Sequence, residues 1–551
     1  MTMEQNTMER NTYHNYQQIL DFQKPESQLK QRKARKKFKK SLDGCMCCKK
    51  RRKKCDESKP ICKACDRNGL DCEWPKHVKV KLVKEEDGVD DGKNGENEFV
   101  LLAQLLNIQL ENENVKSPPS TVESFDFDLP DSLLHEVDQA AESNKILIRD
   151  QNYTIPGIEL SHEDQLCYNQ FIKKFIPSVT ALHCEDDSPA SPYNILTPFA
   201  ATHPLVREIF LACGATLLCF NSDEFHQLAH DKYVHSVNLL VQDLQNSPNA
   251  CEDHLFVSVQ ILQTLCLRDK NIGLNATKSA SHLSAAYEIL KKRRIETPGP
   301  SILDRLLIEH FVFNYPITIM LCHHNKLASN SVPSPFQFFE EFDKILTVPM
   351  INNNSNDPWT NHPLLGMTLK AIELSAKCTW ICRLLQHPIP EQDLLLSSDL
   401  KFQCYEELKV LNEVKNQDRR KLVNISFAKS ILYGCLIITK KICDWDIKLE
   451  ELQDEVNKMI EEYKFCYSLY EPHEVLISIW CLFVSGSASM TMEQREYLTY
   501  GFLNIASKIN SSLTLKILKY LKIIWDEDSS DKSHVGFEFL FDTTVLDIVC
   551  S

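Results

Sequence analysis

Helical periodicity dominates the sequence from about Thr154 to Trp525. Glycine is scarce, at 14 of 551 residues, and no alternation of strand and helix patterns is found, which argues against a turn-rich β fold. The pattern therefore predicts an all-α domain of a dozen or more helices over residues 151–525. Segments with apolar residues every three or four positions lie near 224–244, 253–268, 280–294, 301–322, 365–386, 401–415, 426–444 and 450–469.

Two quoted segments show the pattern in detail. "HPLVREIFLACGATLLCF" begins with His203 and Pro204, and proline fits the first turn of a helix. One stripe of this helix carries Leu205, Ile209, Ala212 and Thr216. In "SLTLKILKYLKIIW", Lys516, Lys519 and Lys522 lie opposite Ile517, Leu521 and Ile524. Both segments predict amphipathic helices with one buried face.

The first 150 residues lack this periodicity. We expect a disordered basic tail over residues 1–40 and a linker over 78–150. The apolar run at 99–110 is shorter than two heptads, so it is either a short dimerisation helix or a packing element. Residues 121–142 mix acidic and apolar side chains without Lys or Arg, which fits either an activation segment or an acidic linker.

The C-terminal tail, residues 526–551, again mixes acidic and aromatic side chains. It has two interpretations, a second activation segment or an element packed on the helical domain. The apolar density of residues 537–549 favours packing.

Charge is distributed unevenly along the chain. The net formal charge is −14, yet residues 30–84 carry a net charge of +15 and the remainder −29. A basic block on an acidic protein indicates a polyanionic partner. The run "LKQRKARKKFKK" at 29–40 also predicts nuclear import.

Membrane insertion and secretion are not expected. Residues 1–10 are polar, so no secretory signal is predicted, and the longest mostly apolar run, Phe311 to Cys322, is too short to cross a bilayer. The 22 cysteines therefore belong in a reducing compartment, where metal binding is favoured over disulfides.

Seven cysteines are concentrated in "CMCCKKRRKKCDESKPICKACDRNGLDC", residues 45–72. Without Cys47 they form two copies of C-x2-C-x6-C, which contain Cys45, Cys48, Cys55, Cys62, Cys65 and Cys72. Two separate four-cysteine zinc sites need eight thiolates, so six predict a binuclear cluster with two bridging sulfurs. Because so short a segment has little core, the bound metal must supply its folding free energy.

This pattern resembles the fungal binuclear zinc-cluster (Zn2Cys6) transcription factors. The resemblance rests on the cysteine spacing, the basic run, Asp56-Glu57, Lys59-Pro60 and Asn68-Gly69-Leu70. It implies a DNA-binding domain over residues 41–77 that binds two Zn²⁺ ions. It also implies that Cys45 and Cys62 bridge the two metals.

The resemblance also assigns the basic run between the cysteines. A short helix after Cys48 would enter the major groove and contact a CGG-like triplet. Arg51 and Arg52 match the base-reading positions, where a guanidinium can pair with guanine O6 and N7. The remaining residues of the run, Lys49, Lys50, Lys53 and Lys54, would contact phosphates.

The implied protein is a nuclear, sequence-specific transcription factor, an activator rather than an enzyme. The helical domain resembles the fungal-specific regulatory domain through "HPLVREIFLACGATLL", "SHLSAAYEIL" and "LIEHFVFNYP". Expected partners are double-stranded DNA, a second subunit in a homodimer or heterodimer, the transcription machinery and a small-molecule effector. The alternatives are a metabolite-binding regulator, or a repressor or cofactor acting through a promoter-bound partner.

Overall fold

The computed structural model describes residues 62–68, most of 152–542, and residue 546. The gaps within this range are at 186, 248, 269–274, 294–299, 330, 351–356, 472–474, 476–477, 528–534 and 543–545. Contacts divide the chain into two units, residues 1–89 and 90–551.

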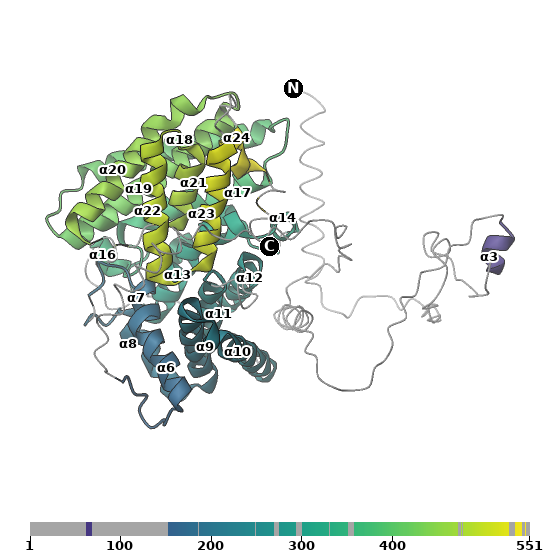
Figure 1. Cartoon of the computed structure of the whole chain (residues 1–551), viewed down its shortest axis with the longest axis vertical. Coiled ribbons are helices and arrows are strands. Elements are labelled where there is room, and N and C mark those ends of the chain that lie inside the picture. The colour runs from purple at the N-terminus through teal and green to yellow at the C-terminus, as the bar shows by residue number, and fades with distance from the viewer. Residues whose placement is uncertain are drawn as a thin grey trace, which may run out of the picture. The chain divides into compact units, whose positions relative to one another are not determined.

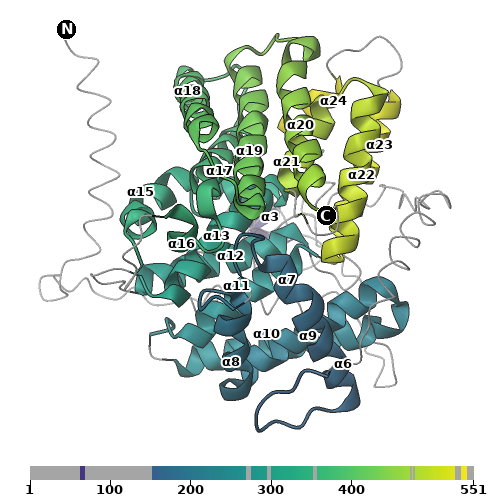
Figure 2. The same ribbon diagram turned by 90° about the vertical axis from the view of Figure 1, so that its left-hand side faces the viewer.

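The described part of the chain is all-α, as the periodicity predicted. Its regular elements are helices, and its one β contact is an isolated bridge between Ile155 and Ile158. In the second unit, the blue and teal helices α6–α12 gather in one half and the green and yellow helices α17–α24 in the other (Figures 1 and 2).

The first half consists of short helices and four longer ones. Its elements are α6 (His162–Gln170), the π-helical turn η4 (Phe171–Phe175), α7 (Ile176–Val179), α8 (Pro192–Thr202), α9 (Pro204–Asn221), η5 (Asp223–Phe225), α10 (His226–Asn246), α11 (Asp253–Cys266) and α12 (Ala276–Lys292). Helix α9 packs against α6, α8, α10 and α11, so it is the centre of this half.

The second half begins with α13, which also contacts the first half. Its elements are α13 (Ile302–Leu321), α14 (His324–Ala328), α15 (Pro335–Thr347), α16 (Pro358–Asn361), η6 (Gly366–Thr368), α17 (Leu369–Leu384), α18 (Glu391–Glu413), α19 (Arg419–Cys443), η7 (Leu449–Leu452), α20 (Gln453–Leu469), α21 (Ile479–Ala488), α22 (Met492–Ile509), α23 (Ser512–Glu527), α24 (Val535–Glu538) and η8 (Phe539–Phe541). Because α13 packs on α11 and α12 and also on α17 and α21, it joins the two halves.

Local sequence signals fix several helix ends. Ser301 and Asp304 form a capping box at the start of α13, and Thr491 and Gln494 form another at the start of α22. Pro204 occupies the first turn of α9, as predicted. Helix α22 ends at Asn510 in the left-handed conformation, φ 50°.

A glycine permits the close crossing of α6 and α9. A Cβ atom on Gly214 would overlap the backbone carbonyl of Cys167. The predicted stripe of α9 is buried beside this crossing, and it consists of Leu205, Ile209, Ala212 and Thr216. The four predicted positions are buried, but α9 does not have a single buried face, because every residue from 209 to 217 is buried among the surrounding helices.

The structure extends one predicted helix and adds another that was not predicted. The segment predicted near 401–415 is the later part of α18, which begins at Glu391. The start of α18 was not predicted because its first turns expose Leu395 and have no clear apolar stripe. Helix α21 was not predicted, since nearly every side chain of "IWCLFVSGSA" is buried and the segment has no polar face.

The described part of the C-terminal tail packs on the helical domain. Phe537, Leu540 and Leu546 are buried, and the Phe541 ring lies 5.3 Å from that of Trp445. The backbone carbonyl of Leu540 accepts a 3.3 Å hydrogen bond from Cys382 Sγ. These contacts agree with the packing interpretation of this segment.

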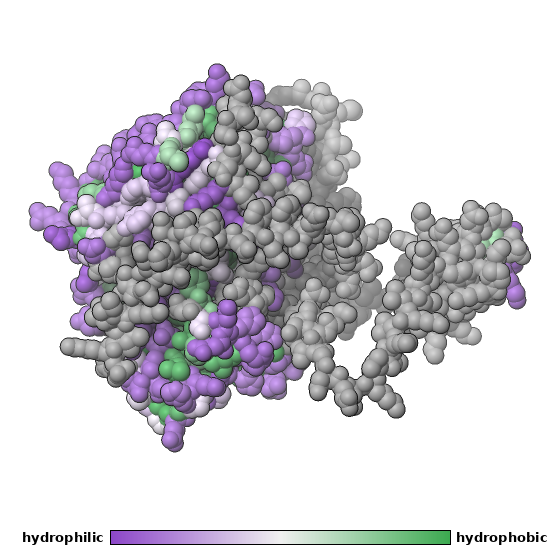
Figure 3. Space-filling view, in the orientation of Figure 1, coloured by the Kyte–Doolittle hydropathy of each residue, from purple (hydrophilic) through white to green (hydrophobic). Residues whose placement is uncertain are grey.

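Helix α19 is long and apolar enough to cross a membrane by length and composition, and no other helix in the described part of the chain is. However, 78% of its apolar window is buried inside the protein, and core helices pass the same test. It packs against α17, α18, α20 and α21. Among the residues coloured by hydropathy in Figure 3, hydrophilic ones predominate, with smaller hydrophobic patches.

Candidate nucleic-acid interface and internal cavity

Two of the six predicted zinc ligands, Cys62 and Cys65, lie in the described residues. Both are buried, and they flank the start of the four-residue helix α3 (Lys63–Asp66). The Cys65 backbone N–H donates to the Cys62 carbonyl at 2.9 Å and to Cys62 Sγ at 3.4 Å. A donor aimed at sulfur favours the thiolate form, which is the form that binds metal.

The residues present fit a zinc site. The C-x2-C turn brings two sulfurs to one short helix, and zinc prefers such soft ligands. A helix of four residues is not stable alone, so a bound metal is the physical reason for it to persist. Zinc would supply folding free energy here rather than reaction chemistry.

Basic side chains lie on the outside of this turn. Lys63 and Arg67 are exposed, and Arg67 Nε donates to the Lys63 carbonyl at 3.2 Å. This places a cation at each end of α3. The arrangement suits contact with phosphate groups, which position a protein on DNA without specifying sequence.

The other predicted site residues lie outside the described residues. They are the ligands Cys45, Cys48, Cys55 and Cys72 and the basic run Lys49, Lys50, Arg51, Arg52, Lys53 and Lys54. Within the part that the structure describes, no three His, Cys, Asp or Glu side chains gather as a metal site would require.

Several serine, cysteine and histidine side chains of the helical domain could be taken for catalytic groups, but their contacts give them structural roles. Ser485 and Ser487 of "SGSAS" are buried in α21 and donate to backbone carbonyls at 2.9 and 2.8 Å. Burial raises the pKa of the Cys378 thiol, and raises that of Cys382 to about 12. Such thiols remain protonated and are poor nucleophiles. His323 Nδ1 accepts the Asn325 N–H at the start of α14.

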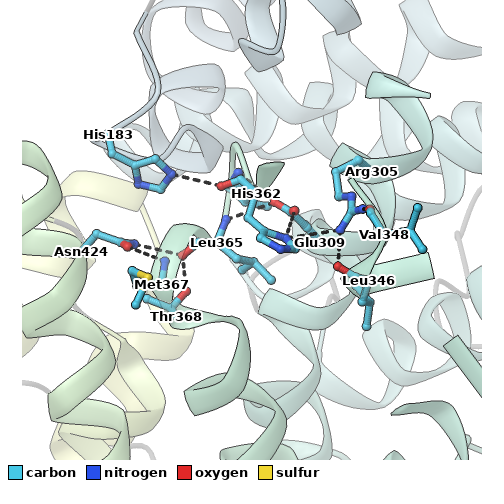
Figure 4. A network of polar contacts seen from close by, with 11 residues as sticks. His183, Arg305, Glu309, Leu346, Val348, His362, Leu365, Met367, Thr368 and Asn424 are labelled. Carbon is cyan, nitrogen blue, oxygen red and sulfur yellow. Dashed lines mark hydrogen bonds and ion pairs between the residues drawn. The ribbon is translucent and has the colours of Figure 1, made fainter. Parts of the chain in front are cut away.

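A buried carboxylate, Glu309, is also accounted for by its surroundings (Figure 4). One oxygen lies 2.8 Å from His362 Nδ1, and the other accepts the N–H groups of Leu364 and Leu365 at 2.9 and 3.1 Å. Arg305 lies beside this cluster, where burial lowers its pKa and the Glu309 charge opposes that effect. The Glu309 charge is therefore compensated by Arg305 and by these hydrogen bonds, which fix the loop before η6, although Arg305 Nε itself has no hydrogen-bond partner.

A large cavity lies where the two halves meet, and sequence reasoning did not predict it. Its volume is about 480 Å³. The walls come from the segment 177–184, the end of α11, and helices α13, α17, α19, α21, α22 and α23. Most lining side chains are aliphatic or aromatic, and none of them is Asp or Glu. Its residues are distributed over distant segments, so no local sequence signal could reveal it.

Comparison with known proteins identifies the cysteine segment. Residues 43–81 match the model of the fungal Zn(2)-Cys(6) binuclear cluster domain, and this interval contains all six predicted ligands and the basic run. Transcription factor lfc1 of Flammulina velutipes is 43% identical over 51 residues. The match covers 9% of this chain and 18% of that protein, so it spans less than a fifth of the relative's length. No solved structure matches the chain.

Proposed function

We propose that this chain is a nuclear, sequence-specific DNA-binding transcription factor, and that it activates its targets. The match of residues 43–81 to the fungal Zn(2)-Cys(6) cluster domain carries this proposal. The buried pair Cys62 and Cys65 supports it, because their hydrogen-bonded turn suits thiolate ligands. The similar segment of lfc1 belongs to a transcription factor, which supports the same proposal.

In the proposed mechanism, zinc folds the cluster domain and the basic run recognises the DNA sequence. Two zinc ions held by the six cysteines would fold residues 41–77 and fix the basic run at the major groove. Arg51 and Arg52 would hydrogen-bond to guanines of a CGG-like triplet, since their forked donors match guanine O6 and N7. The four lysines of the run would contact phosphates, which makes affinity strongly dependent on salt.

A second subunit is required on physical grounds. Three base pairs recur too often in a genome for one cluster to be selective. A homodimer or heterodimer that binds two triplets would remove this limit. The acidic and apolar segment at 121–142 would recruit the transcription machinery.

Selection of bound sites from random DNA by the purified full chain tests the proposal. We expect enrichment of paired CGG-like triplets in the presence of zinc, and loss of enrichment after chelation. In cells, genes with bound promoters should lose expression when the gene for this protein is deleted. Enrichment of no sequence, or bound genes that do not respond, would refute the proposal.

A second candidate function, a metabolite-binding regulator, is favoured by the internal cavity. A volume of about 480 Å³ lies within the range of small-molecule sites. The two functions are compatible, because the cavity and the cysteine segment belong to different units of the chain.

A further inference from the structure

We propose that the cavity between the two halves of the helical domain binds a small organic anion with an apolar body, and that Arg268 holds its anionic group. This inference rests on the second candidate function, the metabolite-binding regulator, and names the class of its ligand; it does not depend on DNA binding. It rests on the position of Arg268, on the charges of the cavity wall and on the apolar remainder of that wall.

Arg268 lines the cavity directly after α11 and is 3% exposed. Its Nη1 donates to the Ile509 carbonyl at 2.9 Å and its Nη2 to Ser178 Oγ at 2.5 Å. One face of the guanidinium lies over the Phe175 ring, 4.4 Å from its centroid. The side chain is therefore held in one place by α7, η4 and the end of α22.

These contacts leave most of the donors of Arg268 unused. A guanidinium has five N–H groups, and the described residues accept from two of them. Its Nε is buried without a hydrogen-bond partner. Burial lowers the pKa of Arg268 to about 10, so the group stays charged at neutral pH. A buried cation of this kind is costly unless an anion compensates it.

Two other arginines of the domain have acidic neighbours. The partly buried Arg293 makes ion pairs with Asp253 and Asp304, and the buried Arg305, whose Nε also has no hydrogen-bond partner, lies beside Glu309. None of the described residues that line the cavity is acidic, while Arg420 and Lys508 add two more cations to its wall. Arg420 lies 4.0 Å from Glu185, an exposed acid outside the lining, so Arg268 is the buried cation of this wall. The missing negative charge is thus a local property of this cavity, and a bound anion would supply it.

The rest of the wall defines the body of the ligand. Phe313 and Ile317 from α13 and Val423 and Phe427 from α19 all line the cavity, and the Phe313 and Phe427 rings lie 6.5 Å apart. Apolar walls with a few convergent polar groups are typical of sites for small amphipathic molecules. We therefore expect a molecule whose carboxylate or phosphate meets Arg268 and whose hydrocarbon part contacts these four side chains.

Calorimetric titration of the purified full chain with octanoate, octan-1-ol and octylammonium tests this inference. The three probes share a chain length and differ in charge. We expect octanoate to bind at least about tenfold more tightly than either of the others, the ratio expected for one charge-assisted hydrogen bond. Failure of octanoate to bind, or equal affinity for the three, would overturn the proposal.

Substitutions test whether the preference for octanoate depends on Arg268. Arg268→Gln should abolish the preference for octanoate, and Arg293→Gln, a paired arginine outside the cavity, should retain it. If Arg268→Gln does not fold, Ile317→Trp, which fills the cavity, should weaken octanoate binding by at least about tenfold. A charge preference that survives in folded Arg268→Gln, or unchanged binding in Ile317→Trp, would refute the site. Since DNA is absent from these titrations, their outcome is independent of the DNA-selection experiment.

Discussion

His310 Nδ1 lies 3.0 Å from Gln260 Oε1, and this contact sets the protonation of the imidazole. Gln260 Nε2 donates to the Leu307 carbonyl at 3.2 Å, so its oxygen faces His310 and accepts a hydrogen bond from Nδ1–H. The other ring nitrogen, Nε2, then accepts the Thr264 hydroxyl at 2.8 Å. Burial and the nearby Arg268 charge lower the pKa of His310 to about 4. The folded protein therefore holds His310 neutral.

We predict that the helical domain loses stability as the pH falls from about 6.5 to about 4. Unfolded His310 binds a proton below about pH 6.5, whereas folded His310 does so only near pH 4. Because the unfolded state binds more protons in this window, the free energy of unfolding falls by on the order of 3 kcal/mol. Urea unfolding of the full chain, followed by tryptophan fluorescence at several pH values, measures the slope.

The matched variant for this prediction is His310→Gln. It should reduce the pH dependence in the same window without removing it, because burial also lowers the pKa of His282, to about 3, and that histidine contributes over the same range. A variant that is less stable at every pH but keeps the wild-type slope would assign His310 a packing role alone.

Gly214→Ala should destabilise the crossing of α6 and α9. The new methyl group overlaps the backbone carbonyl of Cys167, and backbone cannot move aside as a side chain can. We expect a loss on the order of 2 to 4 kcal/mol in the free energy of unfolding, measured by urea titration.

Gly501→Ala is the control for this substitution. Gly501 is also in a helix, but its added Cβ would lie 3.1 Å from Leu482 Cδ2, the end of a flexible side chain. Alanine also favours the helix by about 1 kcal/mol over glycine. A loss at Gly501 as large as that at Gly214 would contradict the steric explanation.

Periodicity predicted the all-α fold and many of its helices, but not every helix. The stripe from Leu205 to Thr216 in α9 is buried as expected, and Pro204 begins that helix. Helix α21 was not predicted because it is buried on all sides, and the start of α18 was not predicted because Leu395 is exposed. Amphipathic contrast alone does not explain these outcomes, because α9 is buried on every side over 209–217 and was predicted, whereas α15, which has one buried face, was not.

The two candidate sites differ in how far sequence could reveal them. The cysteine pattern is local, so the spacing from Cys45 to Cys72 predicted the cluster domain without any fold. The cavity depends on packing between distant segments, since Arg268 meets Ser178 and Ile509 across 90 and 241 positions. A single arginine after an apolar helix gives no sequence pattern from which its position in a cavity could be predicted.

Substitution of two neighbouring cysteines should have opposite results. Cys48 belongs to the repeated C-x2-C-x6-C spacing, so Cys48→Ser should lose zinc and DNA binding. Cys47 interrupts that spacing, so Cys47→Ser should keep two zinc ions per chain and bind DNA normally. Elemental analysis of the purified full chain and fluorescence anisotropy with labelled DNA measure both properties. Zinc loss in the Cys47 variant would show that the ligand assignment is wrong.

Arg52→Ala and Lys49→Ala should separate sequence reading from general affinity. Arg52 is proposed to pair with a guanine, so its loss should cost about 1 to 3 kcal/mol on DNA with a CGG-like triplet and little on random DNA. Lys49 is proposed to contact phosphate, so its loss should weaken both DNAs alike and lower the salt slope by about one. Anisotropy titrations over a salt series measure both effects. If both variants weakened cognate and random DNA equally, Arg52 would be a phosphate contact and base reading would have to come from another residue.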